Sequence, residues 1–174
     1  MNYDEKKKLN EYSKILKFIK NGGGDKHCNL TGCNGRSIGS HIFSRRNIEA
    51  AFGKNKMYVS NVLVTNSVKE AKKANVFPLF CREHDNDLFE SIENANHYNI
   101  DNLSDSFLYF YRLNAYDVYV KKCFNYLLSN GNKWTKKIIR SSPQNYSLTS
   151  NFNLSSDMQN LINDNSLKYF TGDL

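Results

Sequence analysis

The two stretches that decide the fold read CNLTGC over residues 28–33 and CREH over residues 81–84. The first pairs Cys28 with Cys33 across a short turn, in which Gly32 lets the chain bend so that both sulfur atoms face one point. The second pairs Cys81 with His84 at the entry to an expected helix. Three thiolates and an imidazole suit Zn²⁺ better than Mg²⁺ or Ca²⁺. The sequence therefore predicts one structural zinc ion held by these four residues.

Other residues of ligand type leave alternatives open. His27 and His41 lie near the cysteine pairs in the sequence and are substitute ligands, while Cys123 falls in an aromatic-rich helical pattern and is interpreted as a small core residue. The competing interpretation of the metal motif is three buried thiols beside a surface histidine. The binding free energy of a structural zinc ion, about 10–16 kcal/mol in small peptides, is expected to act as folding free energy for residues 28–93.

Charge is concentrated at one end of the chain. Residues 1–56 carry 12 Lys and Arg against 5 Asp and Glu, which accounts for the whole net charge of +7. A basic surface attracts polyanions, of which nucleic acid is the commonest, although basic residues also serve solubility alone. The charge by itself leaves both interpretations open.

The sequence indicates a cytoplasmic protein without a membrane partner. No apolar window is as long as a membrane-spanning helix, and residues 1–8 carry charge with no apolar segment behind them, as a signal peptide would require. Four cysteines in such a chain are read as metal ligands or core thiols, not as disulfides.

Hydrophobic periodicity and turn residues give the expected elements. Helices are expected over residues 4–20, 45–51, from 84 onward, 104–129 and 156–170, strands over 37–43 and 57–64, and connectors over 94–102 and 141–150. Residues 74–80 are apolar, but Pro78 argues against a helix there. The basic residues around Trp134 (Lys133, Lys136, Lys137 and Arg140) are interpreted as a solvated helix end.

Residues 28–93 resemble the HNH endonucleases, a ββα-metal nuclease family. The resemblance lies in the first cysteine pair, then GSHI at residues 39–42, then FPLFCREHD at residues 77–85, and it covers about two-fifths of the chain. In that family a strand carrying a histidine follows the first zinc pair, and an apolar strand then leads into a second zinc pair that opens a helix. The resemblance implies an α+β fold: a small zinc-stabilised ββα-metal core (28–102) with an N-terminal helix (1–27) and a C-terminal helical extension (103–174).

The resemblance also assigns roles. His41 matches the general base of the family, His84 replaces a cysteine ligand of zinc, and Asp85 takes the place of a ligand of the catalytic metal, for which Mg²⁺ or Mn²⁺ is implied. Ser40 stands where many members carry an acidic ligand. The asparagine of the family falls at Val76, one position after Asn75.

Simpler roles compete with these assignments. His41 could be an ordinary surface histidine, and Asp85 a carboxylate that interacts favourably with the helix dipole. Arg45 and Arg46 could contact phosphates beside the site, or could form a solvated helix face.

The resulting expectation is a divalent-metal-dependent endonuclease that hydrolyses phosphodiester bonds, with DNA preferred over RNA as substrate. A setting in phage defence or a mobile element is implied by the resemblance only. The alternative is an inactive zinc-stabilised module that binds nucleic acid or protein, which the departures at Ser40 and Val76 favour. A structural or toxin-like protein without nucleic-acid contact is a third reading, and a protein partner or homo-oligomer stays open.

Overall fold

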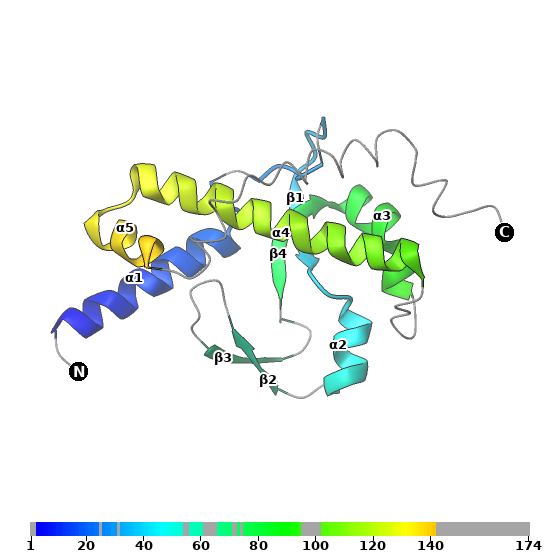
Figure 1. Ribbon diagram of the computed structural model, residues 1–174, viewed down its shortest axis with the longest axis horizontal. Coiled ribbons are helices and arrows are strands. Elements are labelled where there is room, and N and C mark those ends of the chain that lie inside the picture. The colour runs from blue at the N-terminus through cyan, green and yellow to red at the C-terminus, as the bar shows by residue number, and fades with distance from the viewer. Residues whose placement is uncertain are drawn as a thin grey trace.

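A two-stranded antiparallel sheet followed directly by a helix forms the centre of the fold. The computed structural model describes residues 3–24, 26–30, 32–53, 56–60, 66–70, 73, 75–94 and 102–141. In it β1 (Ser37–His41) pairs with β4 (Val76–Cys81), and α3 (Arg82–Asn94) begins at the next residue (Figure 1). Cys81 and His84 therefore lie on either side of a strand-to-helix junction.

The register of this sheet indicates which face of the sheet Ser40 and His41, two neighbouring residues of the HNH-like motif, belong to. Ser40 lies opposite Phe77, and His41 lies opposite Val76. Ser40 is fully buried and Phe77 is 9% exposed, so this pair belongs to the inner face. Because successive side chains of a strand point to opposite faces, His41 is assigned to the outer face together with Gly39. The strand ends at His41, two residues earlier than expected.

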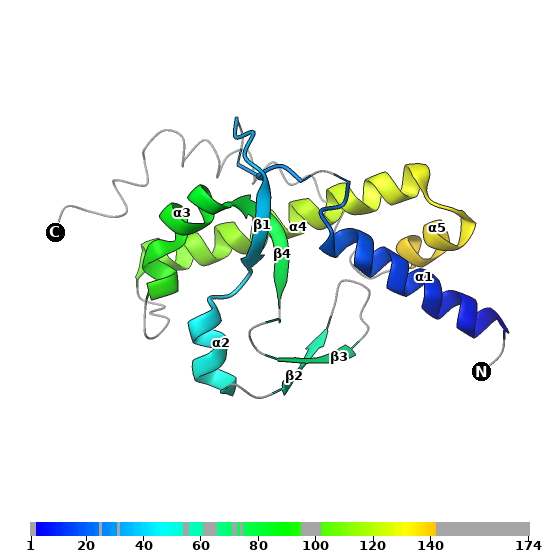
Figure 2. The same cartoon turned by 180° about the vertical axis from the view of Figure 1, so that it is seen from behind.

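An insertion separates the two central strands in sequence. It contains α2 (Arg45–Phe52) and a second antiparallel sheet of β2 (Lys56–Ser60) and β3 (Asn66–Glu70), which lies beyond one end of the β1–β4 sheet in Figure 2. The helix expected over 45–51 is confirmed. The strand expected over 57–64 is found as β2, with residues 61–65 outside the described residues. The sequence did not predict β3, because its segment NSVKE holds one apolar residue and shows no alternation.

Three further helices complete the described fold: α1 (Tyr3–Lys20), α4 (Leu103–Asn130) and α5 (Lys133–Arg140). The first two match the helices expected over 4–20 and 104–129. The connectors expected over 94–102 and 141–150 and the helix expected over 156–170 lie outside the described residues, apart from residues 94, 102 and 141. The chain starts α5 as a separate helix because the Asn132 side chain caps it, accepting from the Thr135 amide at 2.9 Å.

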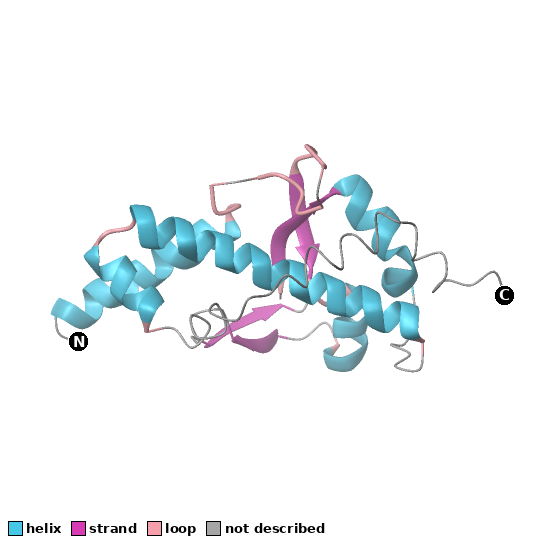
Figure 3. Ribbon diagram, turned by 45° about the horizontal axis from the view of Figure 1, so that its top comes forward, coloured by secondary structure: helices cyan, strands magenta, loops and turns pink. Residues whose placement is uncertain are grey.

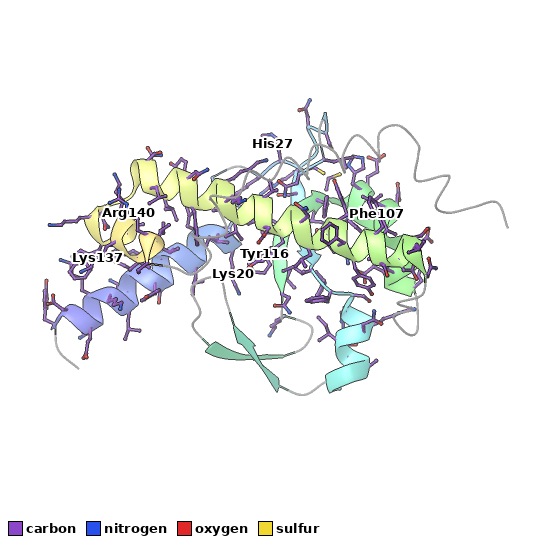
Figure 4. The ribbon with its side chains drawn as sticks, viewed as in Figure 1. Lys20, His27, Phe107, Tyr116, Lys137 and Arg140 are labelled. Carbon is purple, nitrogen blue, oxygen red and sulfur yellow. The ribbon has the colours of Figure 1, made fainter. Side chains whose placement is uncertain are left out.

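Helix α4 covers the inner face of the β1–β4 sheet and joins the helices to one core. The Phe77 and Tyr116 rings lie 4.6 Å apart (Figure 4 labels Tyr116). The Phe80 ring lies 5.0 Å from the tilted ring of Phe89 and stacks with that of Tyr111 at 6.0 Å. Strand and helix residues thus form a continuous hydrophobic cluster. The mixed helix-and-strand architecture agrees with the expected α+β class. Within the described chain, no helix combines the length and the apolar character needed to span a membrane.

The turn after α1 makes a close contact with α4 that predicts an effect on stability. Gly23 has a φ of +60°, and a Cβ at this position would clash with the Sγ of Cys123, which is 1% exposed. The expected core role of Cys123 is thereby confirmed. We expect Gly23→Ala to lower the free energy of unfolding by about 2–4 kcal/mol, from backbone strain and overpacking together.

Urea denaturation of the purified variant measures this effect, and Gly24→Ala is the matched control. Gly24 has a φ of +89°, but its added Cβ would meet only Phe18 at ordinary contact distance, 3.8 Å. In Gly24→Ala the free energy of unfolding should therefore fall only by the cost of backbone strain. An equal fall in both variants would show that the contact with Cys123 contributes nothing.

Candidate metal centre and catalytic residues

Four side chains converge at the end of the β1–β4 sheet where α3 begins. Cys28 and Cys33 lie in the loop before β1, which Figure 3 draws in pink, while Cys81 ends β4 and His84 lies in the first turn of α3. Their ligand atoms all lie within 4.8 Å of one another. The His84 Nδ1 is 3.2 Å from the Cys81 Sγ and 3.5 Å from the Cys28 Sγ, and the Cys33 and Cys81 sulfurs are 3.9 Å apart.

These spacings pass a simple geometric test for a metal site. Ligands around a tetrahedral Zn²⁺ with bonds of about 2.3 Å to sulfur stand about 3.8 Å apart. The four residues predicted from the sequence are therefore brought together in a set that could bind a metal ion such as zinc.

Backbone geometry explains how the loop presents its two cysteines. Gly32 has a φ of +79°, in agreement with the turn expected there. The Cys28 amide donates to the Gly35 carbonyl at 2.8 Å, and the Gly35 amide donates to the Cys33 sulfur at 3.3 Å. A Cβ on Gly35 would lie 2.9 Å from the Cys81 Cβ, so a larger residue there would push the two halves of the site apart. Gly35 is a site residue that the sequence analysis missed.

The alternative ligands fall outside this cluster. His27 is exposed and forms a β-bridge with Arg36 at the base of the loop (Figure 4). Neither His27 nor His41 belongs to the group, which is the one cluster of three or more ligand-type residues among the described residues. Burial raises the pKa of the Cys28 thiol to about 11, so a bound cation would be needed to keep it as a thiolate at neutral pH.

In sequence, His41 lies between the two halves of this cluster, whereas Asp85 lies beyond its last ligand. Asp85 directly follows His84 in α3, and His41 ends β1. Burial raises the pKa of the Asp85 carboxyl, whereas Arg112, a hydrogen bond from the Ser40 hydroxyl and the charge of His41 act to lower it. The structure thus places the predicted base and the predicted metal-binding carboxylate within electrostatic reach of each other.

Asn75 occupies a special position at the entry to β4. Its φ is +55°, a left-handed conformation that asparagine tolerates better than most residues, and its carbonyl accepts from the Ile42 amide at 2.9 Å. Val76 pairs with His41. The asparagine therefore adjoins the strand end that carries His41, although it stands one position away from the place that the HNH resemblance implies.

Arg45 and Arg46 begin α2 and are exposed. The Arg45 Nε is 2.8 Å from Glu49, and the Arg46 guanidinium donates to the Asn94 carbonyl at 3.2 Å. Both side chains thus already have protein partners.

A buried arginine beside the site was not anticipated. Arg112 of α4 is fully buried, and its guanidinium is 3.4 Å from Asp85 and 2.5 Å from Glu93. One sequence signal could have pointed to it: Arg112 lies in an aromatic-rich helical segment and has no acidic residue three or four positions away. An arginine in that setting needs a partner from another element.

Comparisons of this chain with protein-family models, with curated proteins and with solved structures find no match. Its function therefore has to be inferred from its own residues and their geometry.

Proposed function

We propose that this protein is a divalent-metal-dependent DNA endonuclease of the HNH, or ββα-metal, type, with a structural zinc ion. The observation that carries the proposal is the Cys₃His cluster in an arrangement of strand, antiparallel strand and helix, with His41 at the end of the first strand and Asp85 directly after the last ligand. In this proposal the zinc ligands hold the strand that bears His41 against the helix that bears Asp85. The zinc would be structural, because the cluster offers four side-chain ligands, the number that fills a closed tetrahedral site.

The residues suit phosphodiester hydrolysis. The attacking water must lose a proton, and an imidazole such as that of His41 is the side chain that most often accepts it in enzymes. A divalent ion supplies stabilisation of the charge on the phosphate and on the leaving oxygen. Mg²⁺ commonly binds through one or two carboxylates, several waters and the substrate phosphate, so Asp85 beside the Ser40 hydroxyl is a sufficient protein contribution.

A basic groove supports nucleic acid as the substrate. A cavity of ≈ 200 Å³ lies against the β1–β4 sheet, and its lining includes Lys20, Lys26, Arg36 and Gly39. Lys20 ends α1 close to β4 (Figure 4), whereas the other two cations come from the arms of the cysteine loop. Among the described residues, no carboxylate forms an ion pair with any of these three cations. Gly39 of this lining stands two residues before His41 in β1, so a phosphate backbone that follows the strand from the groove would lead toward the proposed base.

We expect the double variant Lys26→Ala/Arg36→Ala to bind duplex DNA more weakly and with less dependence on salt. Each lost phosphate contact should reduce the slope of log K against log salt by about 1. Fluorescence anisotropy with a labelled duplex at several salt concentrations measures this slope, and zinc analysis verifies that the loop is intact. Lys137→Ala/Arg140→Ala removes two exposed cations of α5 and should leave the slope unchanged. Identical slopes in all three proteins would rule out the groove as a phosphate site.

A second candidate function is a zinc-stabilised binding module without catalysis. It is favoured by a specific observation: Asp85 already has a cationic partner in Arg112, and Ser40 supplies a hydroxyl in place of an acidic ligand. Such a module would bind DNA through the groove but would not cleave it.

Plasmid cleavage separates the two functions. Purified protein is incubated with supercoiled DNA and Mg²⁺ or Mn²⁺, with and without EDTA, and zinc content is determined in parallel. Metal-dependent nicking supports the endonuclease, whereas salt-sensitive binding without nicking supports the module. Parallel reactions with RNA test the proposed preference for DNA. A cytoplasmic location and a role in defence or in a mobile element belong to the same proposal.

A further inference from the structure

The guanidinium of Arg112 is enclosed between helices α3 and α4. Its side chain is fully buried, and its Cζ lies 4.0 Å from the centre of the Phe89 ring. Its charged partners are two carboxylates of α3, Glu93 at 2.5 Å and Asp85 at 3.4 Å. Its Nε has no hydrogen-bond partner within the described part of the chain. A buried guanidinium with an unused donor is costly, so an arginine at this position calls for an explanation beyond packing.

The two carboxylates have different surroundings, which suggests different roles. Asp85 and Glu93 lie eight residues apart on α3, roughly 12 Å along its axis. The Glu93 side chain is 32% exposed and makes the shorter contact, so it anchors one side of the guanidinium. The Asp85 side chain is 17% exposed and also accepts from Ser40. A carboxylate has about four acceptor positions. A single long contact to Arg112 therefore orients the Asp85 carboxylate and leaves acceptor positions open for a cation.

We infer that Arg112 is a positioning residue of the proposed nuclease site, which holds the Asp85 carboxylate in the orientation that binds a divalent cation. Glu93 in turn fixes Arg112. This inference rests on the proposed function, and it adds a residue from α4, outside the HNH-like segment, to the site. Partners that orient a metal ligand in this way typically change metal affinity or activity about 10–100-fold when removed.

The test measures Mn²⁺ binding to the zinc-loaded protein by electron paramagnetic resonance, together with plasmid cleavage, zinc content and melting temperature. Arg112→Lys keeps the charge but loses the planar fork that can reach both carboxylates. We expect it to bind Mn²⁺ about 10–100-fold more weakly than wild type while it retains zinc. Arg140→Lys, an exposed arginine of α5, is the matched control and should bind Mn²⁺ like wild type.

A double-mutant comparison distinguishes positioning from general stabilisation. If Arg112 acts through Asp85, Arg112→Lys should add no further loss to Asp85→Asn. The inference is overturned if the losses of Mn²⁺ affinity in the two single variants multiply in the double variant. It is also overturned if Arg112→Lys binds Mn²⁺ as tightly as wild type does. Should Arg112→Lys fail to fold, Glu93→Gln replaces it, because this change loosens the anchor and keeps the buried contact to Asp85. Glu93→Gln should then weaken Mn²⁺ binding severalfold, and unchanged binding would again reject the inference.

The outcomes also separate this inference from the proposed function. Mn²⁺ binding that depends on Asp85 but not on Arg112 rejects the inference alone. A wild-type protein that neither binds Mn²⁺ through Asp85 nor cleaves DNA rejects the endonuclease, and the positioning role with it.

Discussion

His41→Ala is expected to reduce the rate of plasmid cleavage by about 10²–10⁴-fold, the usual contribution of a general base. The physical reason is that the variant lacks the side chain proposed to accept the proton of the attacking water. Initial rates of nicking in Mn²⁺, measured for both proteins at equal concentration, give the ratio directly. Zinc content and DNA affinity should stay unchanged, because His41 lies outside the Cys₃His cluster.

His27→Ala is the matched control for this prediction. His27 is an exposed histidine of the same sheet region that also lies outside the metal cluster. It should therefore cleave at nearly the wild-type rate. If His41→Ala cleaves as fast as His27→Ala, another residue is the base. If the wild type and both variants all fail to cleave DNA, the binding module is favoured instead.

Removal of zinc is expected to unfold the segment that contains the site. Its two halves, the cysteine loop and the β4–α3 junction, meet at the four ligands and at a backbone hydrogen bond of 2.9 Å from the Asn29 amide to the Leu79 carbonyl. Structural zinc contributes about 10–16 kcal/mol of binding free energy in small peptides, which exceeds the stability of most domains. A strong chelator, or the variant Cys81→Ser, should therefore abolish protection of residues 28–93 against hydrogen exchange.

Thermal melts and elemental analysis complete this second experiment. The wild type should contain one zinc per chain, and chelator should lower its melting temperature strongly. Cys123→Ala serves as the control, because this buried cysteine lies outside the cluster. It should lose some stability through a cavity in the core but keep its full zinc content. A wild-type melt that chelator does not shift would contradict a structural role for zinc.

The ligands of the metal cluster were predictable because their signal is local. Each half of the cluster needs only two residues at a short spacing, as in Cys28 with Cys33 and Cys81 with His84. The same holds for the helices over 4–20 and 104–129, whose long apolar faces repeat every three or four residues. Such patterns depend on neighbours in the chain and do not require knowledge of how distant elements pack.

Features with weak local patterns were missed. Gly35 is needed because of the Cys81 side chain across the site, and nothing in residues 33–37 alone shows this. Strand β3 has one apolar residue, and α5 is short and separated from α4 by a two-residue break, so neither produces a clear periodicity. Tertiary contacts stabilise these elements where local propensity does not.

The sequence by itself determined the four candidate ligands of one metal ion and the positions of helices α1, α2 and α4. Only the tertiary structure decided that the Asp85 carboxyl accepts a hydrogen bond from Ser40, and that the Arg112 guanidinium of α4 reaches Asp85. The physical reason is the distance along the chain over which each signal acts. Ligand spacing and amphipathic periodicity involve residues a few positions apart. An ion pair between residues 27 positions apart depends on how one helix crosses another.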